Sequence, residues 1–377
     1  MDQWCSGFEP VRDAHVHVRG METEERLLSI CEAAGIQKMG LVAIQEPESG
    51  EGLPSALQMK SRHPDRFYVF AGLNHAGWLS GGEVEAPGPA EQVEVFERMG
   101  CDGIKMIEGK PTFRQKMDVP VTDPYYAQYW ARVEELGLPI VWHVGDPEEF
   151  WDPAAIPGWA RERDWGYGPE DVRKEDLYGE VDEVLARHPE LKVTFAHFYF
   201  LSADLARAGR FLDAHPSVRF DLTPGIEMLY NISEDPDTGR EFFIRYADRL
   251  VFGTDIFSDL SPQQATIRAG IVFRWLETGD TFRLPREADF LLGPPEDGII
   301  RGITLPEEVL ARIYRDNFVD QAGPEPRALD REAAIEECHR LAAIAESISG
   351  IPASQTEAAR VAALLDRFKE DIGGDRP

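Results

Sequence analysis

The pattern of hydrophobic and polar residues divides most of the chain into short apolar runs separated by longer amphipathic stretches. Eight runs are rich in β-branched or aromatic residues, which is typical of β-strands. These predicted strands cover 10–18, 38–44, 66–73, 102–107, 138–144, 191–197, 217–223 and 249–255. Most of them are almost continuously apolar, as expected for strands of a parallel sheet that is buried on both faces.

Between the predicted strands, hydrophobic residues recur with the period of amphipathic α-helices. The predicted helices lie near 22–34, 54–63, 89–99, 123–136, 176–188, 203–214 and 239–247, and two more follow the last strand near 261–278 and 305–321. Three helices end at a histidine, His63, His188 or His215, and the next residue is a proline that blocks continuation. We interpret these histidines as helix C-terminal residues that complement the helix dipole, and not as catalytic groups.

Eight alternating strand–helix units predict an α/β fold, a (β/α)8 TIM barrel in which helices wrap a closed parallel sheet. A doubly wound open sheet is the alternative. The catalytic barrel would occupy residues 1–324, and residues 325–377 would form a C-terminal helical extension with two acidic helices near 329–347 and 355–371. We expect the extension to pack on the barrel or on a second subunit, so a homodimer is the expected assembly.

Composition narrows the class of protein. Lys and Arg total 39 against 68 Asp and Glu, a formal net charge of −29. An acidic surface repels nucleic acid and anionic membranes, so we expect neither as a partner. The four cysteines form no CxxC pair, which favours a reducing compartment. With no run of about 18 apolar residues and no signal-peptide pattern in the opening MDQWCSGFEP, the sequence predicts a cytoplasmic protein.

Polar side chains recur at the C-terminal ends of the predicted strands. His15 and His17 alternate along the first strand, and His143, His197 and Asp255 lie at the ends of the fifth, sixth and eighth. In a TIM barrel these ends share one rim, where active sites lie. Burying four imidazoles and a carboxylate without partners would cost several kcal/mol, whereas divalent cations bind such groups. The five residues together therefore predict a metal site.

Lys105, in the predicted fourth strand, is a further polar residue in an apolar setting. Strand alternation places Gly103, Lys105 and Ile107 on one face, so we expect the ammonium to face the mouth of the barrel. There it could contact a substrate anion, pair with Asp255, or be carbamylated and bridge two metal ions. A lysine that points into solvent is the structural alternative.

The histidine pair on the first strand, the histidines on the fifth and sixth and the aspartate on the eighth together resemble the amidohydrolase superfamily. The resemblance is greatest to the branch that contains aminocarboxymuconate-semialdehyde decarboxylase and related metal-dependent hydrolases and hydratases (amidohydrolase-2-like). The segments DAHVHV, FAHF and FGTD carry it, within about residues 10–320. It implies a divalent metal, zinc first and manganese or iron as alternatives, held by His15, His17, His143 and Asp255.

The resemblance also implies that His197 binds a second metal in binuclear members, or polarises the substrate in mononuclear ones. Because this branch is usually mononuclear, it favours substrate contact over carbamylation for Lys105.

A metal at this rim would lower the pKa of bound water from about 15.7 toward roughly 7 and so generate hydroxide near neutral pH. We expect Asp255 to accept the proton of the attacking water, and His197 to polarise a carbonyl group. The expected function is a metal-dependent hydrolase that uses this hydroxide on a small carbonyl- or carboxylate-bearing substrate. A metal-dependent decarboxylase or hydratase is the close alternative, and a non-catalytic barrel with a structural metal and an assembly role is the third.

Loops at the same rim would bind the substrate. The long segment after the fifth strand carries Trp151 and is typical of a lid, or of a packed aromatic cover. After the fourth strand, Lys110, Arg114 and Lys116 lie close together in the sequence. They form a basic patch that suits an anionic small molecule, although pairing with acidic neighbours is an equal alternative. Further candidates follow the sixth, seventh and third strands: Tyr199, Glu227 and His75.

Overall fold

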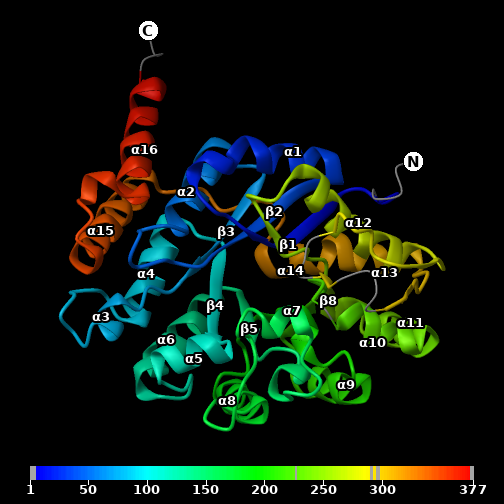
Figure 1. The fold of residues 1–377 in the computed structure, drawn as a ribbon. Helices are drawn as coiled ribbons and strands as arrows, with labels where there is room; N and C mark the ends of the chain where they lie inside the picture. Colours follow the sequence, from blue (N-terminus) through cyan, green and yellow to red (C-terminus); the bar gives the residue numbers. More distant parts are fainter. Residues whose placement is uncertain (1–5, 226, 289–291, 294–297, 374–377) are drawn as a thin grey trace.

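A ring of parallel strands lies at the centre of the molecule (Figure 1). The computed structural model describes residues 6–225, 227–288, 292–293 and 298–373. Seven strands pair in chain order: β1 (Val11–His17), β2 (Ile36–Ala43), β3 (Phe67–Gly72), β4 (Gly103–Gly109), β5 (Ile140–Val144), β6 (Val193–Phe195) and β7 (Val218–Asp221). β8 (Leu250–Val251) pairs with β7, and β9 (Ile256–Phe257) pairs with β1.

β8 and β9 are two parts of one strand position, and together they close the ring. Between them, the backbone N–H of Ala14 donates to Phe252 O (3.0 Å), and that of Asp255 donates to His15 O (2.9 Å). The eighth position therefore bonds to β7 on one side and to β1 on the other. This confirms the predicted TIM barrel.

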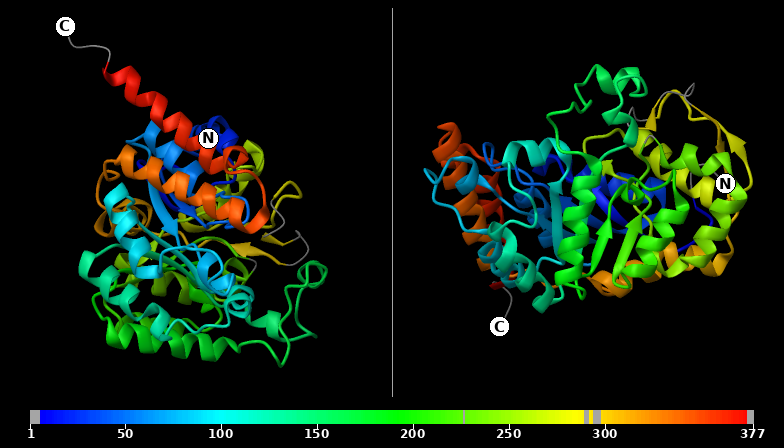
Figure 2. Two further views of the ribbon diagram at one scale, coloured as in Figure 1. Left: turned by 90° about the vertical axis from the view of Figure 1, so that its left-hand side faces the viewer. Right: turned by 90° about the horizontal axis from the view of Figure 1, so that it is seen from below.

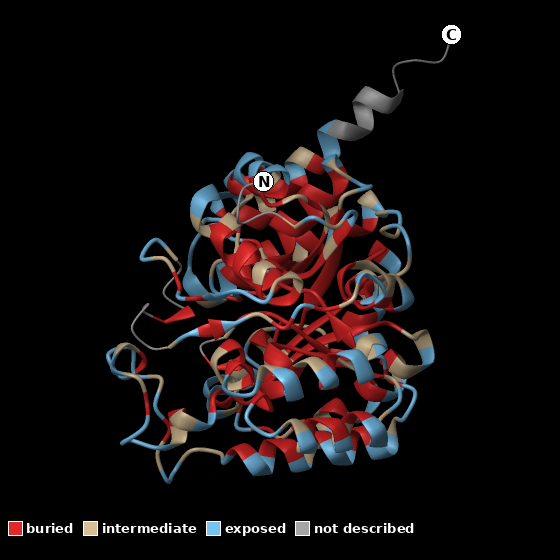
Figure 3. Ribbon diagram, turned by 90° about the vertical axis from the view of Figure 1, so that its right-hand side faces the viewer, coloured by how far each residue is buried: buried red, intermediate tan, exposed pale blue. Residues whose placement is uncertain are grey.

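Helices cover the outside of the ring. They include α1 (Glu24–Ala34), α2 (Leu53–Arg62), α4 (Pro89–Met99), α6 (Pro124–Leu136), α8 (Lys174–Arg187), α9 (Leu205–Ala214), α11 (Pro236–Arg245) and α12 (Pro262–Glu277). The helix predicted at 305–321 consists of α13 (Glu307–Ala311), a π-helical turn (Arg312–Asp316) and α14 (Asn317–Ala322). The strands are buried, whereas the outer faces of the helices are exposed (Figure 3). In the described part of the chain, no helix is both long and apolar enough to cross a bilayer.

The three histidines that precede prolines lie at the C-terminal ends of α2, α8 and α9, as predicted. Each also meets a carboxylate. His63 Nε2 lies 2.8 Å from Glu24, His188 Nδ1 lies 2.9 Å from Glu134, and His215 Nε2 lies 3.9 Å from Asp182. Their imidazoles thus join neighbouring segments on the outside of the barrel.

The C-terminal helices α15 (Arg331–Ser349) and α16 (Glu357–Gly373) pack on the barrel, α15 against α4 and α16 against α2. The far end of α16 projects from the body (Figure 1). The segment that leads to α15 is fixed by Asp102, which accepts a hydrogen bond from the backbone N–H of Arg327 (2.7 Å). Asp102 also accepts one from the backbone N–H of Val69 and forms a fully buried ion pair with Lys60. One carboxylate therefore connects α2, β3 and the extension.

Replacing Lys60 with methionine should lower the free energy of unfolding by about 3–5 kcal/mol, because the Asp102 carboxylate would be left buried without its counter-ion. Urea unfolding followed by circular dichroism measures this. The matched control is Arg98→Met, which removes the exposed pair with Glu336 and should cost less than about 1 kcal/mol. Equal losses of unfolding free energy in the two variants would contradict the role of the buried Lys60–Asp102 ion pair.

Candidate active site

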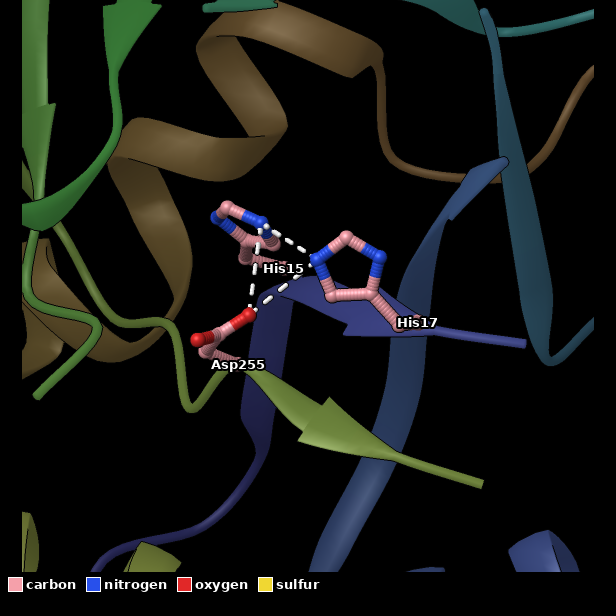
Figure 4. A group of neighbouring side chains, drawn as sticks. All are labelled: His15, His17 and Asp255. Carbon is pink, nitrogen blue, oxygen red and sulfur yellow. Dashed lines mark hydrogen bonds and ion pairs between the residues drawn. The ribbon is translucent and has the colours of Figure 1, made fainter. Parts of the chain in front are cut away.

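Three donor atoms converge where β1 meets the segment between β8 and β9 (Figure 4). His15 Nε2 lies 3.3 Å from His17 Nε2, and Asp255 Oδ1 lies 3.1 Å from His17 Nε2 and 3.8 Å from His15 Nε2. All three side chains are at least largely buried. Burial lowers the pKa of His15 and of His17, so both imidazoles are neutral and offer lone pairs.

This arrangement fits a divalent cation. Ligands about 2.1 Å from a tetrahedral zinc ion lie about 3.4 Å from one another, and the three separations of 3.1, 3.3 and 3.8 Å bracket that value. Neutral imidazole and ionised carboxylate are also the ligand types that zinc, manganese and iron accept. The geometry therefore suits His15, His17 and Asp255 as ligands of one ion.

Asp221, at the end of β7, orients His15 and His197 through hydrogen bonds. Its Oδ2 accepts a hydrogen bond from His15 Nδ1 (2.8 Å), which leaves His15 Nε2 free to face the site. Its Oδ1 accepts hydrogen bonds from the His197 backbone N–H (2.8 Å) and from the Thr223 hydroxyl (2.6 Å). Asp221 is fully buried. A carboxylate behind a histidine that binds metal fixes the tautomer and raises the basicity of the ligand nitrogen.

Asp13 and Arg268 fix the position of Asp255. Asp13 acts through the preceding residue, because it accepts hydrogen bonds from the Thr254 backbone N–H (3.1 Å) and hydroxyl (2.5 Å). The buried Arg268 guanidinium lies 3.3 Å from Asp255 Oδ2, so that Oδ1 faces the histidines. Burial alone would raise the pKa of Asp255, but its contact with His17 and the charge of Arg268 hold it well below its usual value. Asp255 is therefore ionised, the form in which a carboxylate can bind a cation.

His197 begins a left-handed turn on the rim. Residues 197–200 all have φ between 49° and 56°, a conformation that costs roughly 1–2 kcal/mol per non-glycine residue. Thr223 Oγ1 already donates to Asp221, so it accepts from His197 Nδ1 (3.0 Å), and this assigns the ring proton to Nδ1. His197 Nε2 is then unprotonated and can accept a hydrogen bond. Burial lowers the pKa of His197 to about 3, so the ring is neutral.

His143 lies near this group, but the three-donor cluster does not include it. Its ring centroid is 4.9 Å from that of His197, while its Nε2 contacts Gly145 O (3.0 Å) and Asp146 Oδ1 (3.3 Å). Asp146 also accepts hydrogen bonds from Lys110 (2.8 Å) and Tyr167. The expected five-donor cluster is thus corrected to three converging donors, with His143 and His197 beside them, because Asp146 and Gly145 hold His143 Nε2.

Lys105 points into the barrel, as its place on β4 suggested. The side chain is buried, and Nζ lies 3.0 Å from His15 Nε2. Burial lowers the pKa of Lys105 to about 8, while Asp221 and Asp255 oppose the shift. The ammonium group therefore lies next to the lone pair that a cation would use.

A cavity of about 650 Å³ opens above these groups. The side chains of His17, Lys105, His143, His197, Glu227 and Asp255 line its floor and walls. Much of the remaining wall is aromatic: Phe150, Trp159, Trp165, Phe200 and Phe257. Phe150, Trp159 and Trp165 belong to the segment after β5, which projects from the rim of the barrel in Figure 2 and has its own small hydrophobic cluster. The polar groups thus lie at the bottom of a pocket with apolar walls.

Four of the substrate-binding residues expected from the sequence do not line this cavity. The left-handed turn directs the Tyr199 ring outward onto Phe195 and Phe211, with ring centroids 4.2 and 4.8 Å away. His75 is held by Glu108 (2.8 Å) and by the Tyr125 hydroxyl (3.1 Å) on the other face of β4. These placements correct the expectation that Tyr199 and His75 reach the site.

The other two corrections concern loop residues. Trp151 donates to Val172 O (3.1 Å) inside the lid segment, whereas Trp159 and Trp165 of the same segment line the cavity. Arg114 lies 3.7 Å from Glu180 on α8. The expected basic patch does not form, because Lys110 pairs with Asp146 and Lys116 with the exposed Glu48.

Sequence reasoning missed Asp221, Asp146 and Arg268. Asp221 lies at the C-terminal end of β7, so the same rule that identified the other rim residues applies to it. Asp146 lies two residues beyond the end of β5. Arg268 is a lone charge among the apolar positions of α12, and it is 1% exposed. A buried charged residue of this kind needs a partner, which here is Asp255.

The fold is a TIM barrel, and the donor set at its rim is a candidate site for a divalent metal. In agreement, the amidohydrolase family model matches residues 39–317. The chain therefore belongs to the amidohydrolase family, whose members are metal-dependent enzymes. A search of curated proteins finds no match.

Solved structures with the same fold share little sequence with this chain. An uncharacterised TIM-barrel protein from Bordetella bronchiseptica is 15% identical, with a TM-score of 0.50, and the match covers 83% of this chain and 100% of the other. A 2,6-dihydroxybenzoate decarboxylase complexed with 2,6-dihydroxybenzoate is 14% identical, with a TM-score of 0.50 and coverage of 83% and 99%. At these identities the likeness concerns the fold alone.

Replacing Asp221 with asparagine should weaken zinc binding by about 10–100-fold, because the amide NH2 cannot accept the His15 Nδ1 proton and the imidazole loses its orientation. Competition with a chromophoric chelator measures the affinity. Asp213→Asn is the control, since Asp213 pairs with Arg245 on the surface. Wild-type zinc affinity in Asp221→Asn would show that Asp221 does not position His15.

Proposed function

We propose that this protein is a metal-dependent hydrolase that acts on a small carbonyl- or carboxylate-bearing substrate. The observation that carries the proposal is the convergence of His15 Nε2, His17 Nε2 and Asp255 Oδ1 at the base of the cavity, beside the neutral His197. These three residues would hold the ion, with zinc first and manganese or iron as alternatives. When bound, the ion would supply Lewis acidity and would make water nucleophilic near neutral pH.

In this proposal His197, and not Asp255, accepts the proton of the attacking water. Asp255 Oδ2 lies 3.3 Å from Arg268 and Oδ1 lies 3.1 Å from His17, so both carboxylate oxygens are already engaged. His197 presents an unprotonated Nε2, because Thr223 fixes the ring proton on Nδ1. This replaces the expectation that His197 polarises a carbonyl group, since that role needs a proton on Nε2. Lys105 would contact an anionic group of the substrate.

A metal-dependent decarboxylase is the second candidate. The specific observation that favours it is the set of five aromatic side chains on the cavity wall, which suits a planar aromatic acid and excludes water from a departing carboxylate. The structural neighbour that is a dihydroxybenzoate decarboxylase makes such acids reasonable test compounds. Elimination of carbon dioxide and hydrolysis give different products, so a screen of amides, lactones, carboxylated enols and aromatic acids separates the two.

Purified protein should contain close to one equivalent of zinc or manganese. His15→Ala and His17→Ala should each lose both the metal and the activity, because each removes one of three converging donors. Elemental analysis alongside the substrate screen tests this. His63→Ala is the matched control, because His63 lies at the end of α2 and pairs with Glu24. Full turnover by protein without bound metal would rule out the proposal.

His197→Asn should lower kcat by about 10²–10⁴-fold while leaving the metal content and KM close to wild type, because it removes a proton acceptor and not a ligand. Steady-state kinetics on the best substrate of the screen measures the split between kcat and KM. His215→Asn, on the surface end of α9, serves as the control. An unchanged kcat in His197→Asn would contradict the proton-acceptor role.

A further inference from the structure

Glu227 is a buried carboxyl group on the wall of this cavity. It directly precedes α10 (Met228–Glu234), is 6% exposed, and lines the same cavity as Lys105 and His197. Neither Oε1 nor Oε2 forms a hydrogen bond with another residue that the structure describes. Buried polar groups almost always have partners, so an exception calls for an explanation.

The surrounding charges favour the uncharged acid. Burial raises the pKa of Glu227 to about 8, and Glu149 and Asp146 add to the shift, while Lys174 and the backbone amide of Glu227 oppose it. Lys174 is already engaged, because its Nζ donates to Phe200 O (3.2 Å) and lies 3.2 Å from Glu148. Near neutral pH the group therefore carries one O–H donor and one carbonyl acceptor.

The Glu227 carboxyl group lies against Gly225. A Cβ atom added to Gly225 would lie 3.0 Å from Glu227 Oε2, so the carboxyl group packs closely against this glycine. Pro224 and Gly225 both line the cavity. Because Gly225 has no side chain, the Glu227 carboxyl group has room at the cavity wall.

We propose that Glu227, as an uncharged acid, determines substrate specificity by donating a hydrogen bond to an oxygen acceptor of the substrate, a carbonyl or carboxylate oxygen. Two cationic groups of the wall are already paired, Lys110 with Asp146 and Arg268 with Asp255. Glu227, in contrast, offers a donor that no other described residue occupies. The inference deepens the proposed function, because it takes this cavity to be the substrate site.

The test uses benzoate as an acceptor-only probe and isothermal titration calorimetry of full-length, zinc-loaded protein. Glu227→Gln keeps a donor and an acceptor in the same shape, while Glu227→Leu removes both. At pH 7, Glu227→Gln should bind benzoate within about twofold of wild type, and Glu227→Leu about tenfold more weakly, the value of one hydrogen bond.

A change of pH separates donation by Glu227 from other titrations in the site. Between pH 7 and pH 9 the wild-type dissociation constant should rise about tenfold relative to that of Glu227→Gln, because the acid loses its proton and the amide does not. Any effect of Lys105 or of the metal is common to both proteins and cancels in this ratio. A ratio that stays constant, or a wild type that binds more tightly at pH 9, would overturn the proposal.

Two further results would also overturn it: equal weakening in Glu227→Gln and Glu227→Leu at pH 7, and no measurable benzoate binding by any of the three proteins. The outcome is distinct from that of the proposed function. If the ratio of dissociation constants rises with pH as predicted but the protein turns over no substrate, the role of Glu227 stands and the proposed hydrolase activity is wrong. If the protein turns over substrate but the ratio stays constant, the hydrolase activity stands and the role of Glu227 is wrong.

Thermal unfolding gives a readout that needs neither ligand nor metal. A carboxyl group whose pKa is higher in the folded state than in the unfolded chain stabilises the fold at low pH, and this contribution is lost as pH rises through the folded-state value. The unfolding temperature of wild type should therefore fall relative to that of Glu227→Gln as pH rises from 5 to 8. Parallel pH profiles would show that Glu227 is not a buried acid and would contradict the proposal.

Discussion

The candidate site depends on one buried carboxylate, Asp221, that sets the direction of two imidazoles. Asp221 Oδ2 accepts the His15 Nδ1 proton, and Oδ1 accepts both the Thr223 hydroxyl and the His197 backbone N–H. As a result His15 and His197 each present an unprotonated Nε2, one toward the candidate metal position and one as the proposed proton acceptor. Burial keeps both rings neutral at the pH where their lone pairs are needed.

The barrel supplies the rigidity that this network requires. The ring closes through the segment that carries Thr254 and Asp255, so the backbone of the carboxylate ligand is hydrogen-bonded directly to His15 O. Asp255 and residues 197–200 have positive φ, a conformation that isolated L-residues avoid. Within the turn at 197–200, the Tyr199 ring packs on Phe195 and Phe211. Strained backbone of this kind tends to occur where function fixes side-chain direction.

Much of this architecture could be predicted from the sequence. Continuous apolar strands and amphipathic helices have distinct periods, so the barrel and its strands follow from the pattern, and rim positions follow from where each strand ends. The sequence pattern does not predict where side chains beyond the end of a strand point, because this depends on the backbone dihedral angles of the loop. Tyr199 shows this, since a left-handed turn directs it outward onto Phe195. His143 shows a second limit, because its Nε2 is held by Gly145 and Asp146, contacts that a strand pattern does not reveal.

The central claim, that two imidazoles and one carboxylate hold a divalent ion at this rim, is tested most directly by X-ray absorption spectroscopy of the zinc-loaded protein. The account predicts one ion per chain with only nitrogen and oxygen ligands at about 2.0–2.1 Å and with the multiple-scattering signature of at least two imidazoles. A spectrum with sulfur ligands, or with oxygen ligands alone, would place the ion elsewhere and contradict the account.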